Sequence, residues 1–422
     1  MRKTAIGLGL AAVVACSGCG NSGAGNNPDP QSEKRQVSAY TAQGVDSSLV
    51  QASNGFGLSL MEKLMAERPE QNVLLSPLSV SSALALTTTG GAGKTGEEMR
   101  EALGLGGKTN DEIGEGYRVL LDLLRHPGEE GIRTNVANSL WLNEGKPFLD
   151  EFVGRSRDDF GAEVERVDFA APQTLRTMNE WVEKATEGKI KRMLESVEAN
   201  AAMYVLNAVY FNGAWATPFN PERTKDGLFR VSPGETVSAP MMSSGGRYLY
   251  AKKDGYEAIR LPYGKRESAY MAVLLPDEDV SLAELAVRLA ENPGLLTEPY
   301  EARLGSIEIP RLRLEYSEDL VGSLRRAGIA EAFEPDRADF SAMAPEPPNL
   351  FISKVTHRAA LAMDEEGTEA AAATVVEMLA GAAPPEEPFE MKVDRPFIAA
   401  IIDGGTGCVL FAGAVFDPGG GR

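Results

Sequence analysis

The chain contains the apolar run Met203-Tyr204-Val205-Leu206-Asn207-Ala208-Val209-Tyr210-Phe211. A run that is apolar on both faces is typical of a central strand covered on both sides. Asn207 interrupts this run, and a buried amide without partners costs about 1–3 kcal/mol. We therefore expect the Asn207 side chain to be hydrogen-bonded inside the core.

Polar residues in other apolar segments are candidate partners for Asn207. Ser76 and Ser79 begin a predicted apolar helix, and His357 lies in the strand-like segment 351–361. Buried polar groups in proteins are nearly always hydrogen-bonded. These four polar residues from separate apolar segments suggest one shared network in the core.

A second informative segment runs from Asp364 to Val376. Its alanines and glutamates, with Gly381 and Pro384 beyond them, fit a short helix and its stop. In a strand, the same residues would alternate, so that small side chains share one face. That face would carry Thr368, Ala370, Ala372, Thr374 and Val376. Local propensity favours the helix, and the rest of the chain must decide between the two.

Composition and charge narrow the function classes. The chain has 422 residues, 43% of them hydrophobic, and a net charge of -19. This size permits one domain or two with a substantial core, and no internal apolar run is long enough to span a bilayer. A strongly negative chain without a Lys/Arg-rich patch repels nucleic acid and anionic membranes. We expect a soluble protein that does not bind nucleic acid.

The first residues have the pattern of a secretory signal. Two basic residues precede the apolar run Ala5–Ala15, which ends in a small-residue junction before Cys16. This junction resembles a bacterial lipobox, and the resemblance implies removal of residues 1–15 and attachment of lipid to Cys16. Cys19 is a weaker candidate, and a plain secreted protein is the alternative. The expected location is outside the cytoplasm, with the protein anchored in a membrane by its lipid or secreted.

Residues 16–44 follow this signal and are rich in Gly, Asn, Ser, Gln and Pro. Such a composition cannot bury enough apolar surface to fold. We interpret the segment as a flexible tether that holds the following domain about 30 Å from its anchor. A macromolecular partner could then reach the domain.

One apparent phosphate-binding loop does not fit its surroundings. Gly90–Thr95 ends in Gly-Lys-Thr, but Thr88 stands where the first glycine of the motif is needed. The motif also requires a preceding strand, whereas residues 80–89 are predicted to be helical. We expect a turn between two helices, the second beginning near Glu97.

Histidine and cysteine offer no catalytic constellation either. His126 and His357 are the two histidines; we expect His126 to be solvated in a polar turn and His357 to be a satisfied core residue. Cys408 lies in an apolar strand pattern, which predicts a buried, inert thiol. We predict no disulfide framework, no metal site, no cofactor and no enzymatic activity.

A set of motifs occurs in order along most of the chain. They are Ser76-Pro77-Leu78-Ser79, Asn138-Ser139-Leu140-Trp141, Asn179-Glu180-Trp181-Val182, Thr186-Glu187-Gly188-Lys189-Ile190, Phe211-Asn212-Gly213 and Asp394-Arg395-Pro396-Phe397. Together they resemble the serpins, a family of serine protease inhibitors. The resemblance covers residues 45–418 as a single domain, and motifs this numerous are highly specific.

The resemblance implies an α+β serpin fold with three mixed, mainly antiparallel sheets. It also implies about eight or nine helices and an exposed reactive-centre loop. The family's shutter, which gates opening of the central sheet, falls on Ser76, Ser79, Asn207 and His357. The breach, where the loop enters that sheet, falls on Trp215.

The family's hinge and reactive-centre loop fall on residues 364–388. The matching hinge residues are Glu365, Gly367, Thr368, Ala370, Ala372 and Thr374. Inhibitory serpins keep small residues on the inward face of the hinge so that the loop can insert as a strand. The resemblance therefore reverses the local preference for a helix: the segment is expected to be a loop before cleavage and a central strand after it.

The implied function is irreversible suicide inhibition of a serine protease, which binds covalently to the cut loop. Family spacing puts the scissile bond at Gly381-Ala382, but the following stretch is about four residues longer than usual. Leu379, Ala380 and Ala383 are therefore further candidates. None of these residues is basic, so elastase-like or subtilisin-like proteases fit best, with a chymotrypsin-like target if Leu379 is used.

The remaining expectations concern partners. Residues 110–124 are largely acidic or apolar, so no activation by sulfated polysaccharides is expected. We expect a monomer that contacts a membrane through its N-terminal lipid alone. The alternative function is that of a non-inhibitory serpin-fold protein that binds a ligand or partner.

Overall fold

The apolar run around Asn207 forms most of strand β4 (Met203–Ala214), as predicted. Strand β2 (Ile132–Asn143) pairs antiparallel with one edge of β4, and β3 (Ala162–Val167) pairs parallel with β2. The short strand β12 (Gly367–Thr368) pairs antiparallel with the other edge of β4. The resulting sheet has the order β12-β4-β2-β3.

The structure is a computed structural model that describes residues 38–345, 350–368 and 387–420. Within these ranges the helices are of two kinds, α and 3-10. The α-helices are α1 (Ser47–Glu67), α2 (Pro77–Thr88), α3 (Gly93–Ala102), α4 (Asn110–Arg125), α5 (Asp150–Asp158), α6 (Thr174–Ala185), α7 (Leu282–Glu291) and α8 (Val321–Arg326). The 3-10 helices are η1 (Ala42–Gly44), η2 (Pro221–Arg223), η3 (Pro293–Leu296) and η4 (Glu331–Phe333).

Two further sheets complete the described part of the fold. A two-stranded sheet pairs β10 (Leu312–Asp319) with β11 (Thr356–Met363). A nine-stranded sheet has the order β1-β15-β14-β8-β7-β6-β9-β13, with β5 paired on β6. Its strands are β1 (Val73–Leu75), β5 (Lys225–Ser232), β6 (Glu235–Lys253), β7 (Tyr256–Tyr263), β8 (Ala269–Pro276), β9 (Glu301–Pro310), β13 (Phe389–Lys392), β14 (Phe397–Asp403) and β15 (Val409–Val415). The predicted α+β class with three sheets and about eight helices is confirmed.

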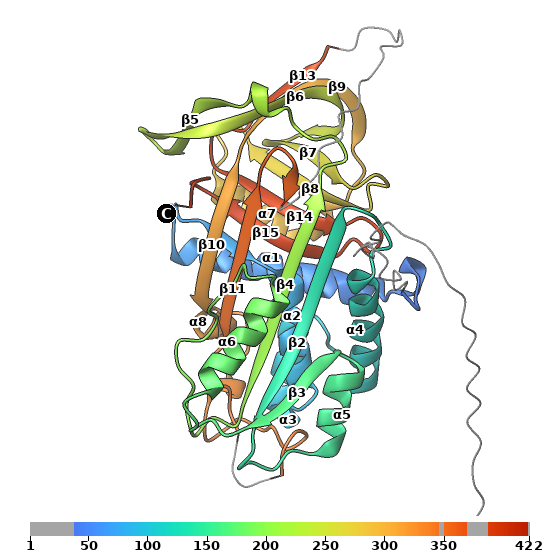
Figure 1. Cartoon of the computed structure of the whole chain (residues 1–422), viewed down its shortest axis with the longest axis vertical. Coiled ribbons are helices and arrows are strands. Elements are labelled where there is room, and N and C mark those ends of the chain that lie inside the picture. The colour runs from blue at the N-terminus through green and yellow to red at the C-terminus, as the bar shows by residue number, and fades with distance from the viewer. Residues whose placement is uncertain (1–37, 346–349, 369–386, 421–422) are drawn as a thin grey trace, which may run out of the picture. The chain divides into compact units, whose positions relative to one another are not determined.

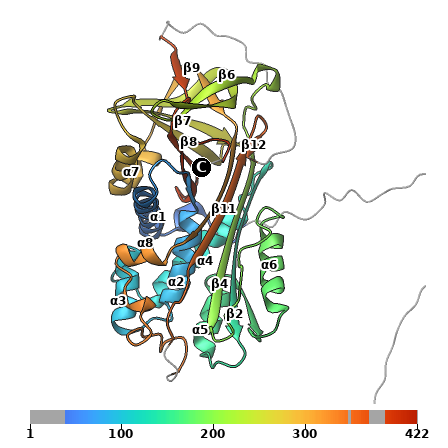
Figure 2. The ribbon, with the colours of Figure 1, turned by 90° about the vertical axis from the view of Figure 1, so that its left-hand side faces the viewer.

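Helices cover both faces of the sheet around β4. Figure 1 shows β10, β11, β4, β2 and β3 side by side, with α6 crossing in front of them. Figure 2, turned by 90°, shows α6 on one side of β4 and β2, and α1 and α2 on the other. Trp141, Met178 and Leu206 are buried together between α6 and the sheet. This double cover explains why β4 is apolar on both faces.

Local sequence explains where two of these helices begin. Ser76 caps α2 by accepting the backbone N–H of Ser79, and Pro77 occupies the first helical position. Thr109 and Glu112 form a reciprocal capping box at the start of α4. These contacts satisfy N–H groups that have no partner within the helix.

One predicted helix start is wrong. Helix α3 begins at Gly93 rather than near Glu97. The backbone N–H of Ala92 donates to the Asp339 carbonyl, and Thr95 Oγ1 accepts the Asp339 N–H. These long-range contacts hold an additional turn that the local pattern does not reveal.

One predicted strand is also shorter than expected. Strand β11 begins at Thr356, whereas the apolar pattern began at Phe351. The backbone N–H of Ile352 donates to Ala332 instead of to a neighbouring strand. Residues 350–355 therefore do not extend the strand, and Ile352 is hydrogen-bonded to the 3-10 helix η4 instead.

The end of the predicted tether contacts the folded unit. The Ser38 hydroxyl donates to the Asp122 carboxylate at 2.5 Å, and the Ala39 backbone N–H donates to the same oxygen at 3.2 Å. Ala42–Gly44 form η1. Residues 38–44 thus have described structure of their own against α4.

Candidate functional site

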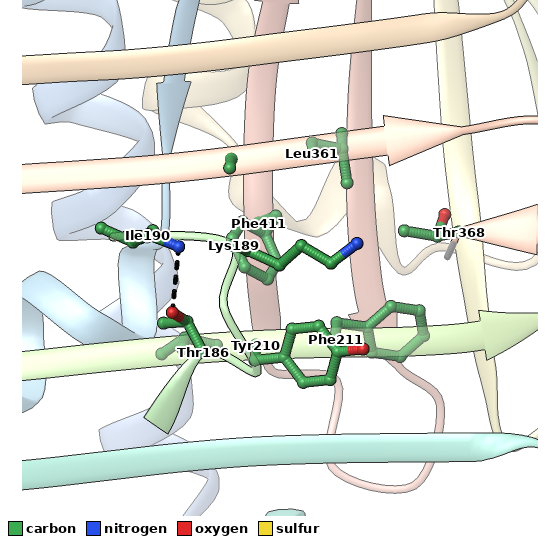
Figure 3. Close-up of a pocket in the computed structure, with 10 residues that line it drawn as sticks. Thr186, Lys189, Ile190, Tyr210, Phe211, Leu361, Thr368 and Phe411 are labelled. Carbon is green, nitrogen blue, oxygen red and sulfur yellow. Dashed lines mark hydrogen bonds between the residues drawn. The ribbon is translucent and has the colours of Figure 1, made fainter. Parts of the chain in front are cut away.

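Strands β4 and β11 lie side by side without pairing to each other in the described residues. Strand β11 pairs with β10, and β4 pairs with β2 and β12. We call the space between β4 and β11 the slot. Figure 3 shows its lining, which comes from both strands, from the segment after α6, and from β12 and β15. The lining residues are Thr186, Lys189, Ile190, Val209, Tyr210, Phe211, Ala360, Leu361, Thr368 and Phe411.

Side chains fill most of the slot. The cavity volume open to water is about 10 Å³, which is near the minimum for one water molecule. Lys189 and Ile190 reach the slot from the segment that follows α6 (Figure 3), and the Ile190 N–H donates to Thr186 Oγ1 at 3.0 Å. A further strand could therefore enter only if this segment moved aside.

Strand β12 occupies the first two positions of the slot. Thr368 pairs with Gly213 and Gly367 pairs with Ala214 on the free edge of β4. The Asp364 backbone N–H donates to the Gly367 carbonyl and closes a tight connection from β11 into β12. At this end, the space between β11 and β4 is therefore wide enough for one strand.

Gly367, a predicted hinge residue, has a backbone that other residues cannot adopt here. Its φ is 153°, and a Cβ at this position would lie 2.1 Å from the Gly213 carbonyl oxygen and 2.8 Å from Ala214 Cα. L-residues rarely adopt such angles, and the backbone of β4 leaves no room for a side chain. Glycine is therefore required for β12 to pair with β4.

Thr368, the next predicted hinge residue, points into an aromatic contact at the same end of the slot. Its side chain is 1% exposed, and its Oγ1 lies 2.5 Å from the Tyr263 hydroxyl. Trp215, the predicted breach residue, stacks on Tyr263 with ring centroids 4.4 Å apart. The Trp215 Nε1–H donates to the Asp364 carbonyl at 2.9 Å. Trp215 thus supports the turn from which β12 emerges.

Glu365 is buried beside this turn and forms an ion pair with the partly exposed Arg311. Its side chain is 6% exposed, and the Arg311 guanidinium donates to both of its carboxylate oxygens at 2.7–3.0 Å. The Thr224 hydroxyl donates to the same carboxylate. Burial alone would raise the pKa of Glu365, but the hydrogen bonds from Arg311 and Thr224 outweigh it and lower that pKa. The carboxylate therefore stays ionised and ties the start of the hinge to the residue before β10.

The amide of Asn207 is fully used in a buried network beneath the slot. Its Oδ1 accepts the Ser79 hydroxyl, and its Nδ2 donates to Asn138 Oδ1 at 2.5 Å and to Ser82 Oγ at 3.2 Å. Asn138 lies directly opposite Asn207 in the register of β2 and β4. The network therefore joins two strands of the sheet to helix α2.

The other half of this network reaches β11. The Ser76 backbone N–H donates to His357 Nε2 at 3.4 Å, and Ser76 Oγ caps the Ser79 N–H. Burial lowers the pKa of His357 to about 4, against a smaller opposing effect of the Leu74 backbone. The structure thus brings together all four residues assigned to the shutter. Their role in gating the sheet stays a prediction.

The remaining predicted site residues lie outside the described residues. They are the lipidation candidate Cys16, the hinge residues Ala370, Ala372 and Thr374, and the scissile-bond candidates Leu379, Ala380, Gly381, Ala382 and Ala383.

Several residues of the site were not found from the sequence. Asn138 and Ser82 complete the buried network. At the end of the slot where β12 lies, which we call its mouth, Tyr263 is hydrogen-bonded to Thr368. Arg311 and Thr224 are hydrogen-bonded to Glu365 at the same end. Asn138 carried a usable signal, because it is a second amide within an apolar strand pattern. Ser82 lies three residues after Ser79 on α2, whereas Tyr263, Arg311 and Thr224 lie on segments far from the hinge in sequence, and nothing local marks these three as its partners.

Two other predictions can be compared with the described residues. Cys408 is buried and unpaired, and burial raises the pKa of its thiol, as expected for an inert cysteine. The expectation of a solvated His126 is wrong. His126 is half-buried at the end of α4, and its Nδ1 lies 2.9 Å from the Asp122 carbonyl oxygen one turn earlier.

Within the described ranges, no group of three or more His, Cys, Asp or Glu side chains is arranged to hold a metal ion. None of the helices in the same ranges combines the length and apolar character needed to cross a bilayer.

Comparison with known families gives a match over most of the chain. Residues 51–418 match the family model described as "Serpin (serine protease inhibitor)". A serpin-like protein of Thermococcus kodakarensis is 33% identical over 382 residues, which cover 89% of this chain and 87% of that protein. The leukocyte elastase inhibitor of Sus scrofa is 35% identical over 380 residues, covering 87% of this chain and 98% of the relative.

Solved structures show the same similarity in three dimensions. The native state of tengpin, a thermophilic serpin, superposes with a TM-score of 0.79 at 29% identity, covering 88% of this chain and 95% of that one. Human thyroxine-binding globulin in complex with its hormone superposes with a TM-score of 0.77 at 26% identity, covering 88% of this chain and 100% of that one.

Proposed function

The chain belongs to the serpin family, and from that premise we propose that it is an irreversible, suicide-type inhibitor of serine proteases. The observation that carries the proposal is the slot. In the described residues, the edge of β4 that faces β11 is unpaired except at its first two positions, which β12 occupies. The residues that follow β12 in the chain could therefore extend its pairing along the same edge of β4.

The register indicates which residues would fill the slot. Gly367 and Thr368 pair antiparallel with Ala214 and Gly213. Continuing that register places residues 369–378 opposite residues 212–203 of β4. Each added pair would complete backbone hydrogen bonds along an edge that is unpaired before insertion. Loop insertion in serpins is a known example of a proteolytic switch that releases stored strain.

The chemistry of capture needs only the target's own catalytic serine. The serine oxygen attacks the carbonyl carbon of the scissile bond, the C–N bond breaks, and the new amino terminus leaves with a proton. The protease then remains attached to residues before the cut through an ester. If those residues enter the slot before water hydrolyses the ester, the protease is carried along and its active site is distorted.

The candidate residues before the cut point to the target class. Leu379, Ala380, Gly381, Ala382 and Ala383 include no basic residue, so the buried carboxylate of a trypsin-like pocket would be left unpaired. Elastase-like or subtilisin-like proteases accept small side chains. The similarity to a relative named leukocyte elastase inhibitor supports the same class. Cleavage after Leu379 would indicate a chymotrypsin-like target.

A gel experiment tests the proposed function. The protein is mixed with an elastase, and separately with trypsin, and each mixture is run under denaturing conditions. We expect a stable covalent band with elastase and none with trypsin. Cleavage without such a band across several serine proteases, at excess inhibitor, would show that the protein is a substrate and not a trap.

A non-inhibitory binding function is the second candidate. The similarity to thyroxine-binding globulin shows that this fold also occurs in a hormone complex. The glycine and the small Thr368 at the mouth of the slot support insertion instead, because neither obstructs the free edge of β4.

We also propose that the protein is anchored outside the cytoplasm through lipid on Cys16. The support is the sequence pattern alone, a short apolar run that ends before this cysteine. Labelling with a radioactive fatty acid should mark the natural protein, and Cys16→Ser should abolish the label. Persistence of the label in that variant would contradict the assignment.

A further inference from the structure

The end of helix α4 contacts the sheet β12-β4-β2-β3 through one arginine. Arg125 is the last residue of α4, and Figure 2 shows α4 on the side of β2 opposite to α6. The Arg125 Nε–H donates to the Val136 carbonyl on β2 at 2.8 Å. The Nη2 of the same guanidinium donates to the carbonyl of Phe160, two residues before β3, at 3.4 Å. One side chain therefore joins α4 to β2 and to the segment that leads into β3.

The residues around Phe160 leave room for this contact. Phe160 is fully buried, and its ring packs on Tyr117 of α4 with centroids 5.4 Å apart. Gly161 follows with a φ of 58°, and a Cβ there would lie 2.3 Å from Arg125 Nη1. Glycine adopts such a backbone readily and leaves space for the guanidinium. Helix α4 thus contacts Phe160 at two positions, through Tyr117 and through Arg125.

The Phe160 carbonyl also accepts a hydrogen bond from the buried amide network. The Asn138 Nδ2 donates to it at 2.9 Å, and the Asn138 side chain is 1% exposed. A carbonyl oxygen has two lone pairs, so it can accept from Asn138 and from Arg125 together. This shared oxygen connects α4 to the network that contains Asn207.

A carbonyl oxygen can only accept, and this fixes the orientation of the Asn138 amide. With its Nδ2 on the Phe160 carbonyl, Asn138 presents Oδ1 to Asn207, whose Nδ2 donates to it at 2.5 Å. The Asn207 Oδ1 in turn accepts the Ser79 hydroxyl. A reversed Asn138 amide would place oxygen against oxygen at Phe160 and donor against donor at Asn207. Both bonds would then be lost between buried groups, which is unfavourable.

We propose that Arg125 is a positioning residue for this network. It holds the Phe160 carbonyl in place, and that carbonyl sets the direction of the hydrogen bonds from Asn138 through Asn207 to Ser79. Helix α4 and the centre of the sheet are thereby coupled, so a displacement of the end of α4 reaches Asn207. The coupling is a property of the folded protein alone, and it does not rest on the proposed inhibition.

The test observes side-chain amides by nuclear magnetic resonance in the full chain, labelled with heavy nitrogen at asparagine. The signals of Asn138 and Asn207 are assigned from their through-space contacts with β2 and β4. Asn54 is the internal reference, because it is also buried but belongs to a different set of bonds. Its amide donates to the Gly407 carbonyl, and its Oδ1 accepts the Val409 N–H.

Two substitutions of Arg125 are compared with a control on the same helix. Arg125→Met keeps the apolar stem but removes every donor. Arg125→Lys keeps the charge but loses the planar fork that reaches two carbonyls. Arg118→Met is the matched control, since Arg118 also lies on α4 but its guanidinium is 3.7 Å from the Asp159 carboxylate.

We expect Arg125→Met to shift the side-chain amide signals of Asn138 and Asn207 and to make their exchange with solvent about tenfold faster, the effect of about one hydrogen bond. Arg125→Lys should show the same change, while Arg118→Met and the Asn54 signal should not change. Unchanged Asn138 and Asn207 signals in Arg125→Met would overturn the inference. Full recovery in Arg125→Lys would also overturn it, because the charge alone would then suffice.

The reference signal separates coupling from general destabilisation. If exchange of Asn54 accelerates as much as that of Asn138 in Arg125→Met, the inference is wrong, because the whole fold is then less stable. If the variants do not fold, exchange in the unaltered protein decides. Asn138 and Asn207 should then exchange at rates within about twofold of each other, since groups in one cooperative unit open together. Exchange of Asn138 about tenfold or more faster than that of Asn207 would contradict the coupling.

Discussion

At the scale of single residues, the size of the Thr368 side chain affects whether a strand can enter the slot between β4 and β11. It is buried against Tyr263 and is the last described residue before the segment that would insert. Its small size lets the strand pass between β4 and β11 without displacing the aromatic residues there. The proposed inhibition requires a small side chain at this position, because a protein whose cut loop cannot insert is only a substrate of the protease.

If the protein is the inhibitor proposed above, we predict that Thr368→Arg converts it into a substrate. An arginine at this buried position would displace β12 from β4, and insertion would then have to bury an unpaired guanidinium, which costs several kcal/mol and slows insertion relative to ester hydrolysis. In the gel assay with elastase, the covalent band should almost disappear while cleaved protein accumulates. Thr368→Ser keeps the hydroxyl and should form complex normally. Undiminished complex in Thr368→Arg would refute the insertion argument.

His357 provides a second prediction at the residue scale. Its Nε2 accepts a backbone N–H, so protonation would break that bond and bury a charge. The pKa is about 4 in the folded protein and about 6.5 in an unfolded chain. The unfolded state therefore binds more protons between these values, and stability falls as the pH falls through this range.

The expected size of this pH effect is about 2 kcal/mol between pH 8 and pH 5. Thermal unfolding at both pH values measures it, and His357→Gln should show a smaller loss because glutamine does not titrate. An equal loss in the variant and the unaltered protein would assign the pH dependence to other groups.

At the scale of elements, helix α2 connects the two sides of the slot. Ser79 bonds to Asn207 on β4, while the Ser76 N–H bonds to His357 on β11. No ladder joins β4 to β11 in the described residues. The start of one helix thus links the two strands in place of direct strand pairing.

We predict that Asn207→Ala destabilises the protein by about 1–3 kcal/mol, because it leaves the buried partners of the amide unsatisfied. Asn138→Ala should act on the same network, so the double variant should cost less than the sum of the two. A double-mutant cycle from unfolding curves measures this coupling, expected at about 1 kcal/mol. Strict additivity would show that the two amides act independently.

At the scale of the whole molecule, the described part of the sheet β12-β4-β2-β3 leaves most of one edge of β4 unpaired. Filling it with residues 369–378 would add a ladder of about ten residues next to β4. At about 1 kcal/mol for each hydrogen bond, the stabilisation is about 10 kcal/mol. For a domain of this size, it corresponds to a rise of about 10 °C in unfolding temperature.

This rise is the prediction for the whole molecule. Elastase-cleaved protein, freed of protease, should unfold at least about 10 °C above the intact protein in a thermal scan. Cleavage at a surface site outside the loop provides the control, since it should not raise the unfolding temperature. A cleaved protein that melts at or below the intact one would argue against insertion.

Much of the fold and part of the site were predictable from sequence. The apolar run around Asn207 predicted β4, and the Ser-Pro-Leu-Ser motif predicted the start of α2, because burial and capping leave local patterns. Buried polar residues were predictable as a group, since each must find a partner in the core. The additional turn of α3 was not, because its contact with Asp339 is distant in sequence.

The sequence by itself determined that this chain is an α+β serpin and that the residues after Glu366 are mostly small, because ordered motifs and side-chain sizes are local properties. Only the tertiary structure decided where the hinge goes. Propensity favoured a helix after Asp364, yet Gly367 and Thr368 form a strand on β4. The physical reason is that the free edge of β4, Tyr263 and Arg311 come from distant segments, and their contacts outweigh a local preference of less than about 1 kcal/mol per residue.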